Sequence, residues 1–308
     1  MSDPHAGTLE LYAMPGNEAR ADALAARLGL RRSGLWLHRF PDGESLVRVQ
    51  PPGKAVAVVC TLRDPDALTL PLLMAAATLR ELGAAQVGLV APYLAYMRQD
   101  RAFEPGQAVS ARIYAALLSG HFDWLLTVDP HLHRIDSLDR VYSLRSRVVH
   151  AAAAIARWVA GEIAQPLLIG PDAESRQWVA EVARRVGAPM LVLDKQRRGD
   201  LEVSSRLPDL RPWAGRTPVL LDDIASSGRT LAVVLESLRG RSMAPAACVV
   251  THGLFALDAL DLLRAAGAAR IACTDSVEPP PGVECIPLDA DLAQALGDMS
   301  ACAKETRS

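Results

Sequence analysis

Short apolar runs alternate with longer amphipathic stretches along almost the whole chain. The apolar runs lie at residues 9–14, 56–60, 87–91 and 124–128 in the first half, and at 167–170, 190–193, 218–221, 247–251 and 270–273 in the second. Continuous apolar runs of this length are typical of strands buried on both faces of a parallel sheet. The pattern therefore predicts an α/β fold, with mostly parallel sheets covered by helices on both faces.

The stretches between these runs have the periodicity of helices. Helices are predicted at residues 17–28, 66–82, 110–118, 150–159, 174–186, 231–239, 257–265 and 292–302. Asn17 is a typical helix cap, and Gly29 and Gly83 are typical of helix ends. Residues 35–50 interrupt the alternation, because two strand-like runs there flank a Pro-Asp-Gly turn. This segment predicts a β-hairpin.

The same plan of strands and helices runs through both halves of the chain. The length of 308 residues suits two domains of ordinary size. We expect an N-terminal domain over residues 1–146 and a similar C-terminal domain over residues 147–308. Whether the last helix packs back on the first domain stays open at this point.

Composition and charge exclude several classes of protein. The formal net charge is −2, so no basic field points to nucleic acid. No apolar run approaches the roughly 20 residues that span a bilayer, and the first residues lack the pattern of a signal peptide. The five cysteines are scattered, which favours buried thiols over a redox or metal centre. We therefore expect a soluble, cytoplasmic protein that binds neither nucleic acid nor a membrane.

The stretch 218–231 carries the clearest chemistry. An apolar strand runs into Asp222 and Asp223, a small hydroxylated loop follows at Ser226–Thr230, and a helix comes next. A loop that opens a helix at the carboxyl end of a strand offers unpaired N–H groups to an anion. The two carboxylates cannot bind a phosphate, so sugar hydroxyls or a metal ion are their expected partners. A phosphorylated sugar fits all of these parts.

Polar residues follow other strands in the same way. They are Phe40, Asp42 and Glu44; Arg98–Arg101; Asp129 and His131; Asp172; and Lys195 with Arg197. Each has an ordinary structural explanation when it is taken alone: a hairpin turn, a solvated basic loop, an ion-pair cluster or a surface histidine. Their occurrence at matching places in one alternating chain indicates an active site instead.

These segments resemble a known family. The 218–231 stretch resembles the 5-phosphoribosyl 1-diphosphate (PRPP) motif of type I phosphoribosyltransferases and of ribose-phosphate diphosphokinases, also called PRPP synthetases. Segments 39–44, 92–101, 128–131, 170–172 and 194–197 look like successive signatures of the diphosphokinases, and segment 92–101 is specific to them. The resemblance runs from about residue 10 to residue 290. Segments 129–134 and 170–175 look closest to the archaeal-type branch.

The resemblance implies two phosphoribosyltransferase-like domains and transfer of the diphosphoryl group of ATP to the 1-hydroxyl of ribose 5-phosphate. The residues it assigns to ATP are Phe40, Asp42, Gly43, Glu44, Arg98, Gln99, Asp100 and Arg101. The turn at 42–44 is expected to come from a neighbouring subunit of a homo-oligomer, a dimer or larger. His131 and Asp172 are assigned to Mg²⁺, which prefers oxygen ligands and keeps several waters.

The remaining assignments concern the acceptor and the transfer itself. Lys195 and Arg197 are the implied catalytic residues, on a flexible loop that neutralises the developing negative charge. The residues assigned to ribose 5-phosphate are Arg197, Asp222, Asp223, Ser226, Ser227, Gly228, Arg229 and Thr230. No covalent nucleophile is needed, because the sugar hydroxyl itself attacks.

Three positions depart from the family pattern. Arg229 stands where the phosphate loop usually has a small glycine, and Ser226 replaces an acidic residue of many diphosphokinases. The triplet 173–175 replaces the His-Gly-Gly of the better-studied branch, which puts its regulatory nucleotide site in doubt. Two other functions stay open: a phosphoribosyltransferase that consumes PRPP, and a catalytically silent, synthetase-associated regulatory protein. The pair at Lys195 and Arg197 favours an active enzyme.

Overall fold

The computed structural model describes residues 8–132, 135–193, 195–198, 202–205 and 207–305, although the side chains of 195–198, 202–205 and 301–305 are not part of the description. The chain forms two compact units. The first combines Met1–Val149 with Asp289–Ser308, and the second is His150–Leu288. The last helix therefore belongs to the first unit.

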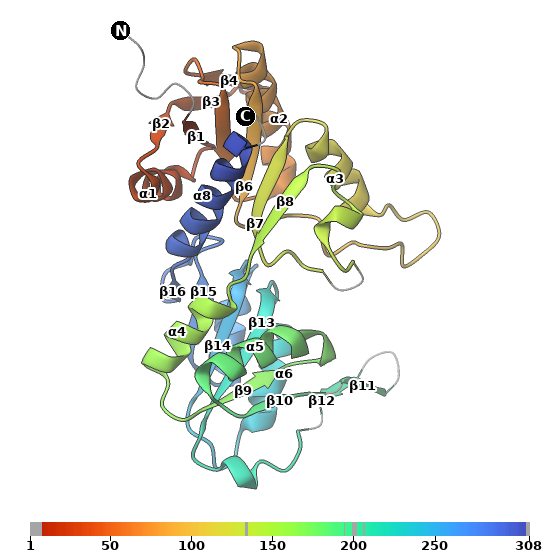
Figure 1. The fold of residues 1–308 in the computed structure, drawn as a ribbon. Helices are drawn as coiled ribbons and strands as arrows, with labels where there is room; N and C mark the ends of the chain where they lie inside the picture. The colour runs from red at the N-terminus through yellow and green to blue at the C-terminus, as the bar shows by residue number, and fades with distance from the viewer. Residues whose placement is uncertain (1–7, 133–134, 194, 199–201, 206, 306–308) are drawn as a thin grey trace. The chain divides into compact units, whose positions relative to one another are not determined.

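The first unit is built on a six-stranded sheet with the order β2-β1-β5-β6-β7-β8, and every neighbouring pair is parallel. The strands are β1 (Leu9–Ala13), β2 (Arg31–Ser33), β5 (Ala55–Val59), β6 (Gln86–Ala91), β7 (Trp124–Val128) and β8 (Arg145–Val149). Helices α1 (Glu18–Leu28) and α8 (Asp289–Glu305) pack together on one face, and α2 (Pro65–Glu81) and α3 (Ser110–Ser119) cover the other, as Figure 1 shows.

The second unit repeats this topology. Its sheet has the order β10-β9-β13-β14-β15-β16, again with every pair parallel. The strands are β9 (Pro166–Gly170), β10 (Met190–Val192), β13 (Thr217–Ala225), β14 (Ala246–Gly253), β15 (Ala268–Thr274) and β16 (Glu284–Ile286). Helices α4 (Ala152–Glu162) and α5 (Arg176–Val186) pack together, as do α6 (Arg229–Leu238) and α7 (Ala259–Ala266). The predicted α/β fold is confirmed.

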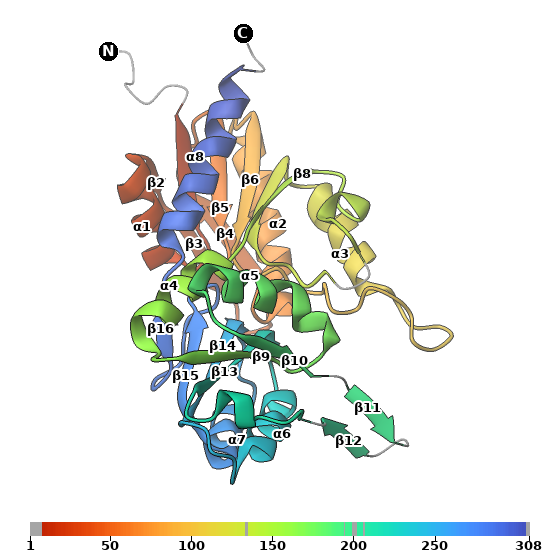
Figure 2. The ribbon, with the colours of Figure 1, turned by 60° about the horizontal axis from the view of Figure 1, so that its bottom comes forward.

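Each unit also carries a two-stranded antiparallel hairpin at the same point of its topology. The hairpin of β3 (Leu35–Arg39) and β4 (Ser45–Val49) follows β2 in the first unit. The hairpin of β11 (Lys195–Arg198) and β12 (Glu202–Ser205) follows β10 in the second, and Figure 2 shows it apart from the main sheet. Both hairpins come just before the third strand of their sheet.

Several elements differ from the sequence-based predictions. The resemblance implies a loop at Lys195 and Arg197, but the backbone there forms strand β11 of the second hairpin. The edge strands β2 and β8 were not predicted, because their sequences Arg-Arg-Ser and Arg-Ser-Arg-Val-Val lack a continuous apolar run. Charged residues of this kind protect the open edge of a sheet from pairing with other chains.

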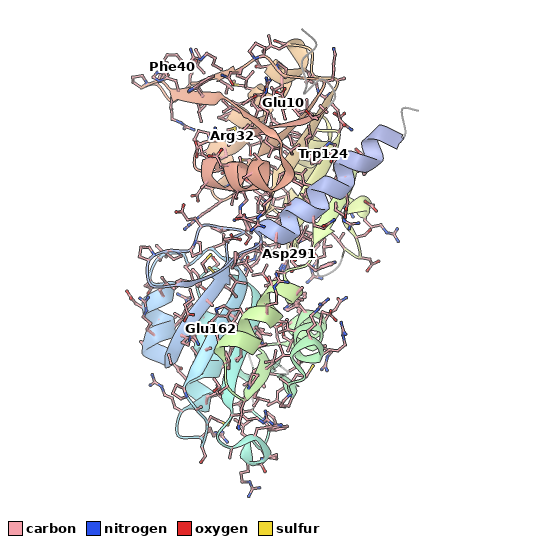
Figure 3. All side chains as sticks on the ribbon, turned by 60° about the vertical axis from the view of Figure 1, so that its left-hand side comes forward. Glu10, Arg32, Phe40, Trp124, Glu162 and Asp291 are labelled. Atoms are coloured by element: carbon pink, nitrogen blue, oxygen red, sulfur yellow. The ribbon has the colours of Figure 1, made fainter. Side chains whose placement is uncertain are left out.

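Edge strand β2 is held by a buried acid on its neighbour β1. Glu10 is only 3% exposed, and its Oε1 accepts a 2.6 Å hydrogen bond from Nη2 of Arg31. Figure 3 labels Glu10 inside the first unit. Its other oxygen accepts hydrogen bonds from the hydroxyls of Tyr12 and Ser33, both at 3.3 Å. A buried carboxylate is tolerated here because it has these partners.

The cysteines agree in part with the prediction of buried thiols. Cys60, Cys248 and Cys273 are buried, and burial raises the pKa of each to about 12. Thiols held in this neutral form are poor nucleophiles. Cys285 is exposed on β16, and Cys302 lies outside the described side chains. None of the helices in the described part of the chain combines the length and hydropathy needed to cross a bilayer.

Candidate functional site

The clearest binding feature of the second unit is the loop that joins β13 to α6. The strand continues through Asp222 and Asp223 to Ala225, and α6 begins at Arg229, two residues before the predicted start. Gly228 caps the helix in the left-handed conformation, with φ of 69°. A Cβ at Gly228 would also lie 3.3 Å from Cγ of Leu263 on α7. Backbone angle and packing both favour glycine here.

The first turn of α6 presents donors to an anion. Its first helical hydrogen bond runs from the Ala232 amide to the Gly228 carbonyl at 2.9 Å. The amides before Ala232 have no partner inside the helix, and the helix dipole adds positive potential at this end. Ser227 and Arg229 are exposed, whereas Ser226 and Thr230 are half-buried. Arg229 has ordinary helical geometry, so the loop does not need a glycine there.

A second loop, after β14, is hydrogen-bonded to the start of the loop at residues 226–230, which is called the anion loop below. The amides of Phe255 and Ala256 donate to the carbonyls of Ala225 and Ser226, both at 2.9 Å. The loop follows β14, the strand next to β13, so both loops leave the same edge of the sheet. These backbone contacts fix the anion loop at its entry. They had no signal in the sequence, because a backbone amide can belong to any residue type.

Three carboxyl groups gather where β9 and β13 lie side by side. The Asp223 amide donates to Oδ1 of Asp222 at 3.0 Å. Burial raises the pKa of Asp222 well above its ordinary value, and the charges of Asp223 and Asp172 raise it further. In sheets of this order, ligands bind where the strand order reverses, which here is between β9 and β13.

Asp172 is fixed by a tight turn after β9. Its carboxylate accepts a 3.3 Å hydrogen bond from the Ser175 amide, and its carbonyl accepts one of 2.6 Å from the Ser175 hydroxyl. Ser175 is fully buried, and a Cβ at Gly170 would lie 2.3 Å from its Oγ. A larger residue at position 170 would force Ser175 to move. Sequence reasoning gave Gly170 and Ser175 no role beyond the motif, although a glycine two residues before an acid is a usable signal.

In the first unit, the loops at the equivalent point between β1 and β5 are joined by the side chain of Asn17. Oδ1 of Asn17 accepts a 2.7 Å hydrogen bond from the Thr61 amide, and its Nδ2 donates to the Pro15 carbonyl at 3.3 Å. Asn17 thereby joins the loops after β1 and β5, where this sheet reverses its order. Asn17 is the N-cap residue of α1, as predicted, but its side chain makes no capping hydrogen bond, because these partners occupy the amide. The two units thus share a topology but differ in the loops at this position.

The first hairpin presents Phe40 and the following turn. The amide of Phe40 donates to the Glu44 carbonyl at 2.8 Å, and that of Gly43 donates to the Phe40 carbonyl at 2.9 Å. Oδ1 of Asp42 accepts a 3.1 Å hydrogen bond from the Glu44 amide. Gly43 has φ of 92°, and Phe40 is 39% exposed at the end of the hairpin in Figure 3. Asp42 therefore stabilises the turn, whatever else it binds.

The predicted nucleotide residues of the first unit also lie after strands. Arg98 and Gln99 follow β6, and His131 follows the neighbouring strand β7. Arg98 is exposed, and Gln99 and His131 are half-buried. Arg101 lies over the ring of Phe103, with its Cζ 4.9 Å from the ring centroid. The structure thus brings the segment at 98–101 and His131 to one edge of the first sheet.

Backbone strain is concentrated at the same edges. Six described residues other than glycine have positive φ: Asp64, Tyr96, Asp129, Gln165, Phe255 and Leu257. Five of them follow the carboxyl ends of β5, β6, β7 and β14, and only Gln165 does not. Strained residues of this kind cluster at ligand-binding sites, because the surrounding structure must hold them in place. Their positions support the strand ends as functional.

The two catalytic residues implied by the sequence lie on the second hairpin. The backbone pairs Lys195 with Ser205 and Arg197 with Val203 across β11 and β12. Their side chains lie outside the described part of the structure. In the described residues, histidine, cysteine and acidic side chains form no group of three or more arranged to hold a metal ion.

Comparisons with known proteins concern the family and the fold of the chain. Residues 9–121 match a family model described as the N-terminal domain of ribose phosphate pyrophosphokinase, and residues 141–258 match the phosphoribosyl transferase domain. A crystal structure of phosphoribosylpyrophosphate synthetase from Mycobacterium smegmatis has the same fold, with a TM-score of 0.80 and 21% identity. That match covers 97% of this chain and 99% of the other.

Sequence relatives cover most of the chain as well. The ribose-phosphate pyrophosphokinase of Methanopyrus kandleri is 34% identical over 266 residues, which is 85% of this chain and 89% of the relative. That of Halobacterium salinarum is 30% identical over 285 residues, or 92% and 97% of the two chains. These relatives confirm the resemblance drawn from the motifs. The chain belongs to the ribose-phosphate pyrophosphokinase family.

Proposed function

We propose that this chain is an active ribose-phosphate diphosphokinase that forms PRPP and AMP from ribose 5-phosphate and ATP. The observation that carries the proposal is the β13–α6 loop, in which Gly228 opens a helix end directly after the acidic pair of Asp222 and Asp223. A helix end suits a phosphate, and adjacent carboxylates suit ribose hydroxyls. Family membership supports the reaction, and the proposal extends it to this chain's own residues.

The acceptor sugar is assigned to the second unit. The 5-phosphate would accept hydrogen bonds from the first amides of α6 and from the hydroxyls of Ser226, Ser227 and Thr230. Asp222 and Asp223 would accept hydrogen bonds from the ribose hydroxyls. Arg229 is exposed in the first turn, where its cation adds to the positive potential at the helix end. Its departure from the family pattern is therefore compatible with phosphate binding.

The nucleotide is assigned to the first unit. Arg98 would form a forked pair with phosphate oxygens, and Gln99, Asp100 and Arg101 would bind on the same segment. Phe40 would stack on adenine, with Gly43 and Glu44 of the same turn alongside. We further propose a cytoplasmic homo-oligomer in which this hairpin serves a neighbouring subunit. The exposed Trp36, Phe40 and Leu46, at 45%, 39% and 49%, are apolar surface that a second copy would cover.

We propose that Asp172 of the second unit takes part in binding a divalent cation. Burial raises the pKa of Asp222, and the negative charges of Asp223 and Asp172 raise it further, so a nearby cation would favour the ionised form. Mg²⁺ is the ion that we propose, because it is usually bound through one or two carboxylates together with substrate phosphates and waters. Asp172 and His131 are the residues that we propose to hold or orient Mg²⁺, either directly or through its waters. When bound, it would neutralise phosphate charge.

The transfer step needs positioning and charge stabilisation. The 1-hydroxyl oxygen of ribose 5-phosphate attacks the β-phosphorus of ATP, and the bond from that phosphorus to the oxygen bridging to the α-phosphate breaks. AMP leaves with this oxygen, and the hydroxyl gives up its proton. Lys195 and Arg197 would neutralise charge on the transferring group, and Arg197 would also contact the sugar phosphate. A covalent enzyme intermediate is not required.

The test is AMP release from ATP by the purified chain with Mg²⁺. Ribose 5-phosphate should support release. Arabinose 5-phosphate, which has the opposite configuration at C2, and xylulose 5-phosphate, a ketose without an anomeric 1-hydroxyl, should support much less. Removal of Mg²⁺ with a chelator should abolish the reaction. No AMP with any pentose phosphate would overturn the proposal. Consumption of PRPP together with a nucleobase would then indicate a phosphoribosyltransferase. If the chain has no turnover of its own but stimulates an active relative, it would be a regulatory protein.

A further inference from the structure

Tyr96 has a backbone conformation that is unusual for tyrosine, in the segment that leads from β6 to Arg98 and Gln99. It follows β6 with φ of 63°, although its neighbours are ordinary and the residue is a bulky aromatic. The left-handed region costs free energy for such residues, so the fold must hold it in place. Residues 92–95 and Met97 around it are buried, whereas Tyr96 is half-buried. Packing of the segment alone therefore leaves its side chain at the surface.

Two contacts hold the Tyr96 side chain. Its hydroxyl donates to Oδ1 of Asp66, in the first turn of α2. This hydrogen bond is also the main reason that the pKa of Tyr96 is raised. Its ring packs against Tyr114 of α3, with centroids 4.7 Å apart and planes tilted by 48°. Tyr114 in turn forms a 3.0 Å hydrogen bond with Thr69, one turn along α2.

The backbone of Tyr96 begins the turn that carries Arg98 and Gln99. The Gln99 amide donates to the Tyr96 carbonyl at 3.3 Å, which closes this turn. The Gln99 carbonyl accepts a 3.2 Å hydrogen bond from the Ala111 amide at the start of α3. The turn is therefore fixed at its end by α3 and at its beginning by the strained residue. The link from Tyr96 to Asp66 is the side-chain contact that ties this beginning to α2.

We propose that Tyr96 is a positioning residue for the nucleotide, and that its hydrogen bond to Asp66 holds Arg98 and Gln99 in their binding arrangement. The inference rests on the proposed role of Arg98 and Gln99 in binding ATP. The ring contact with Tyr114 keeps the segment packed, and the hydroxyl selects the backbone conformation. Loss of the hydroxyl should therefore weaken nucleotide binding with little effect on folding or on the sugar site.

The experiment compares Tyr96→Phe with Tyr114→Phe, because each removes one hydroxyl from the same ring pair. Tyr96→Phe should raise KM for ATP about tenfold, the scale of losing a hydrogen bond to a charged group. Its KM for ribose 5-phosphate and its kcat should stay within about twofold. Tyr114→Phe should leave all three near their original values. Asp66→Asn keeps an acceptor and should preserve KM for ATP, whereas Asp66→Ala should behave like Tyr96→Phe.

Direct titration of ATP into each variant, without ribose 5-phosphate, separates this inference from the proposed function. If the original chain binds ATP but releases no AMP, the dissociation constants still decide the role of Tyr96. An unchanged dissociation constant in Tyr96→Phe would overturn the inference. Equal weakening in both tyrosine variants would overturn it too, because the effect would then not be specific to the hydrogen bond between Tyr96 and Asp66. If the original chain makes PRPP and the Tyr96→Phe variant binds ATP normally, the inference about Tyr96 fails but the proposed function stands.

Discussion

The charge of the Asp172 carboxylate, just after β9, helps to raise the pKa of the Asp222 carboxyl on the neighbouring strand β13. Burial raises the pKa of Asp222 most, Asp223 adds to this effect, and Asp172 contributes across the two strands. A cluster of this kind is unfavourable for folding when its members are ionised. A bound cation, or the hydroxyls of a sugar, would reduce this cost.

Replacing Asp222 with Asn should stabilise the protein at neutral pH. The folded state holds the Asp222 proton more tightly than the unfolded state, so ionisation costs stability. This cost is absent below the unfolded pKa, which is near 3.8, and grows as the pH rises towards the raised folded pKa. Each tenfold change in proton affinity corresponds to about 1.4 kcal/mol. Thermal unfolding of Asp222→Asn should show a gain at pH 7 that disappears near pH 4.

Asp209, in the same unit, serves as a control because its pKa is lowered, whereas that of Asp222 is raised. Its hydrogen bonds with Arg211 lower its pKa, and both groups are at the surface. Asp209→Asn should therefore leave stability at pH 7 unchanged or slightly lower, as is usual for exposed pairs. PRPP synthesis should fall strongly in Asp222→Asn and stay normal in Asp209→Asn. A loss of stability at pH 7 in Asp222→Asn would show that its carboxylate is already compensated in the folded protein.

Gly228→Ala tests the anion loop. The new Cβ would have to accept φ of 69° and a 3.3 Å approach to Cγ of Leu263. We expect KM for ribose 5-phosphate to rise at least tenfold, together with a loss of roughly 1–3 kcal/mol in stability. Gly240→Ala is the matched control, because Gly240 has φ of 70° with nothing within 4 Å of the added atom. It should reproduce the strain but leave KM unchanged.

The strand, turn and helix around residues 218–231 were predictable from sequence because their signals are local. Strand, acidic pair and glycine-bearing turn occupy one short segment, and the structure moves the helix start by only two residues. The charged edge strand β2 and the hairpin at β11 were missed, because neither has the apolar run that marks a buried strand. The left-handed backbone of Tyr96 was equally hidden, since tyrosine is not expected there. Such conformations depend on tertiary contacts.

Gly170→Ala should disturb the acidic cluster without touching its carboxylates. A Cβ at residue 170 would lie 2.3 Å from Oγ of Ser175 and 3.3 Å from Cγ2 of Val179, in a buried turn. We expect loss of about 1–3 kcal/mol from overpacking and a higher Mg²⁺ requirement, because Ser175 holds Asp172. Gly161→Ala, with open space on α4, should instead be neutral or slightly stabilising. An unchanged Mg²⁺ dependence would remove Asp172 from the metal site.

Lys195→Ala tests whether the second hairpin carries the transfer step. Lys195 and Arg197 occupy alternate positions of β11, and alternate positions of a strand share one face. Removing one preorganised cation should lower kcat by two or more orders of magnitude while the protein remains folded. Arg198→Ala changes a neighbouring cation at the intervening register and should keep kcat within about threefold. Single-turnover measurement of AMP formation would separate the chemical step from product release. Near-normal turnover in Lys195→Ala, with Arg198→Ala impaired, would assign catalysis to the other register of the strand.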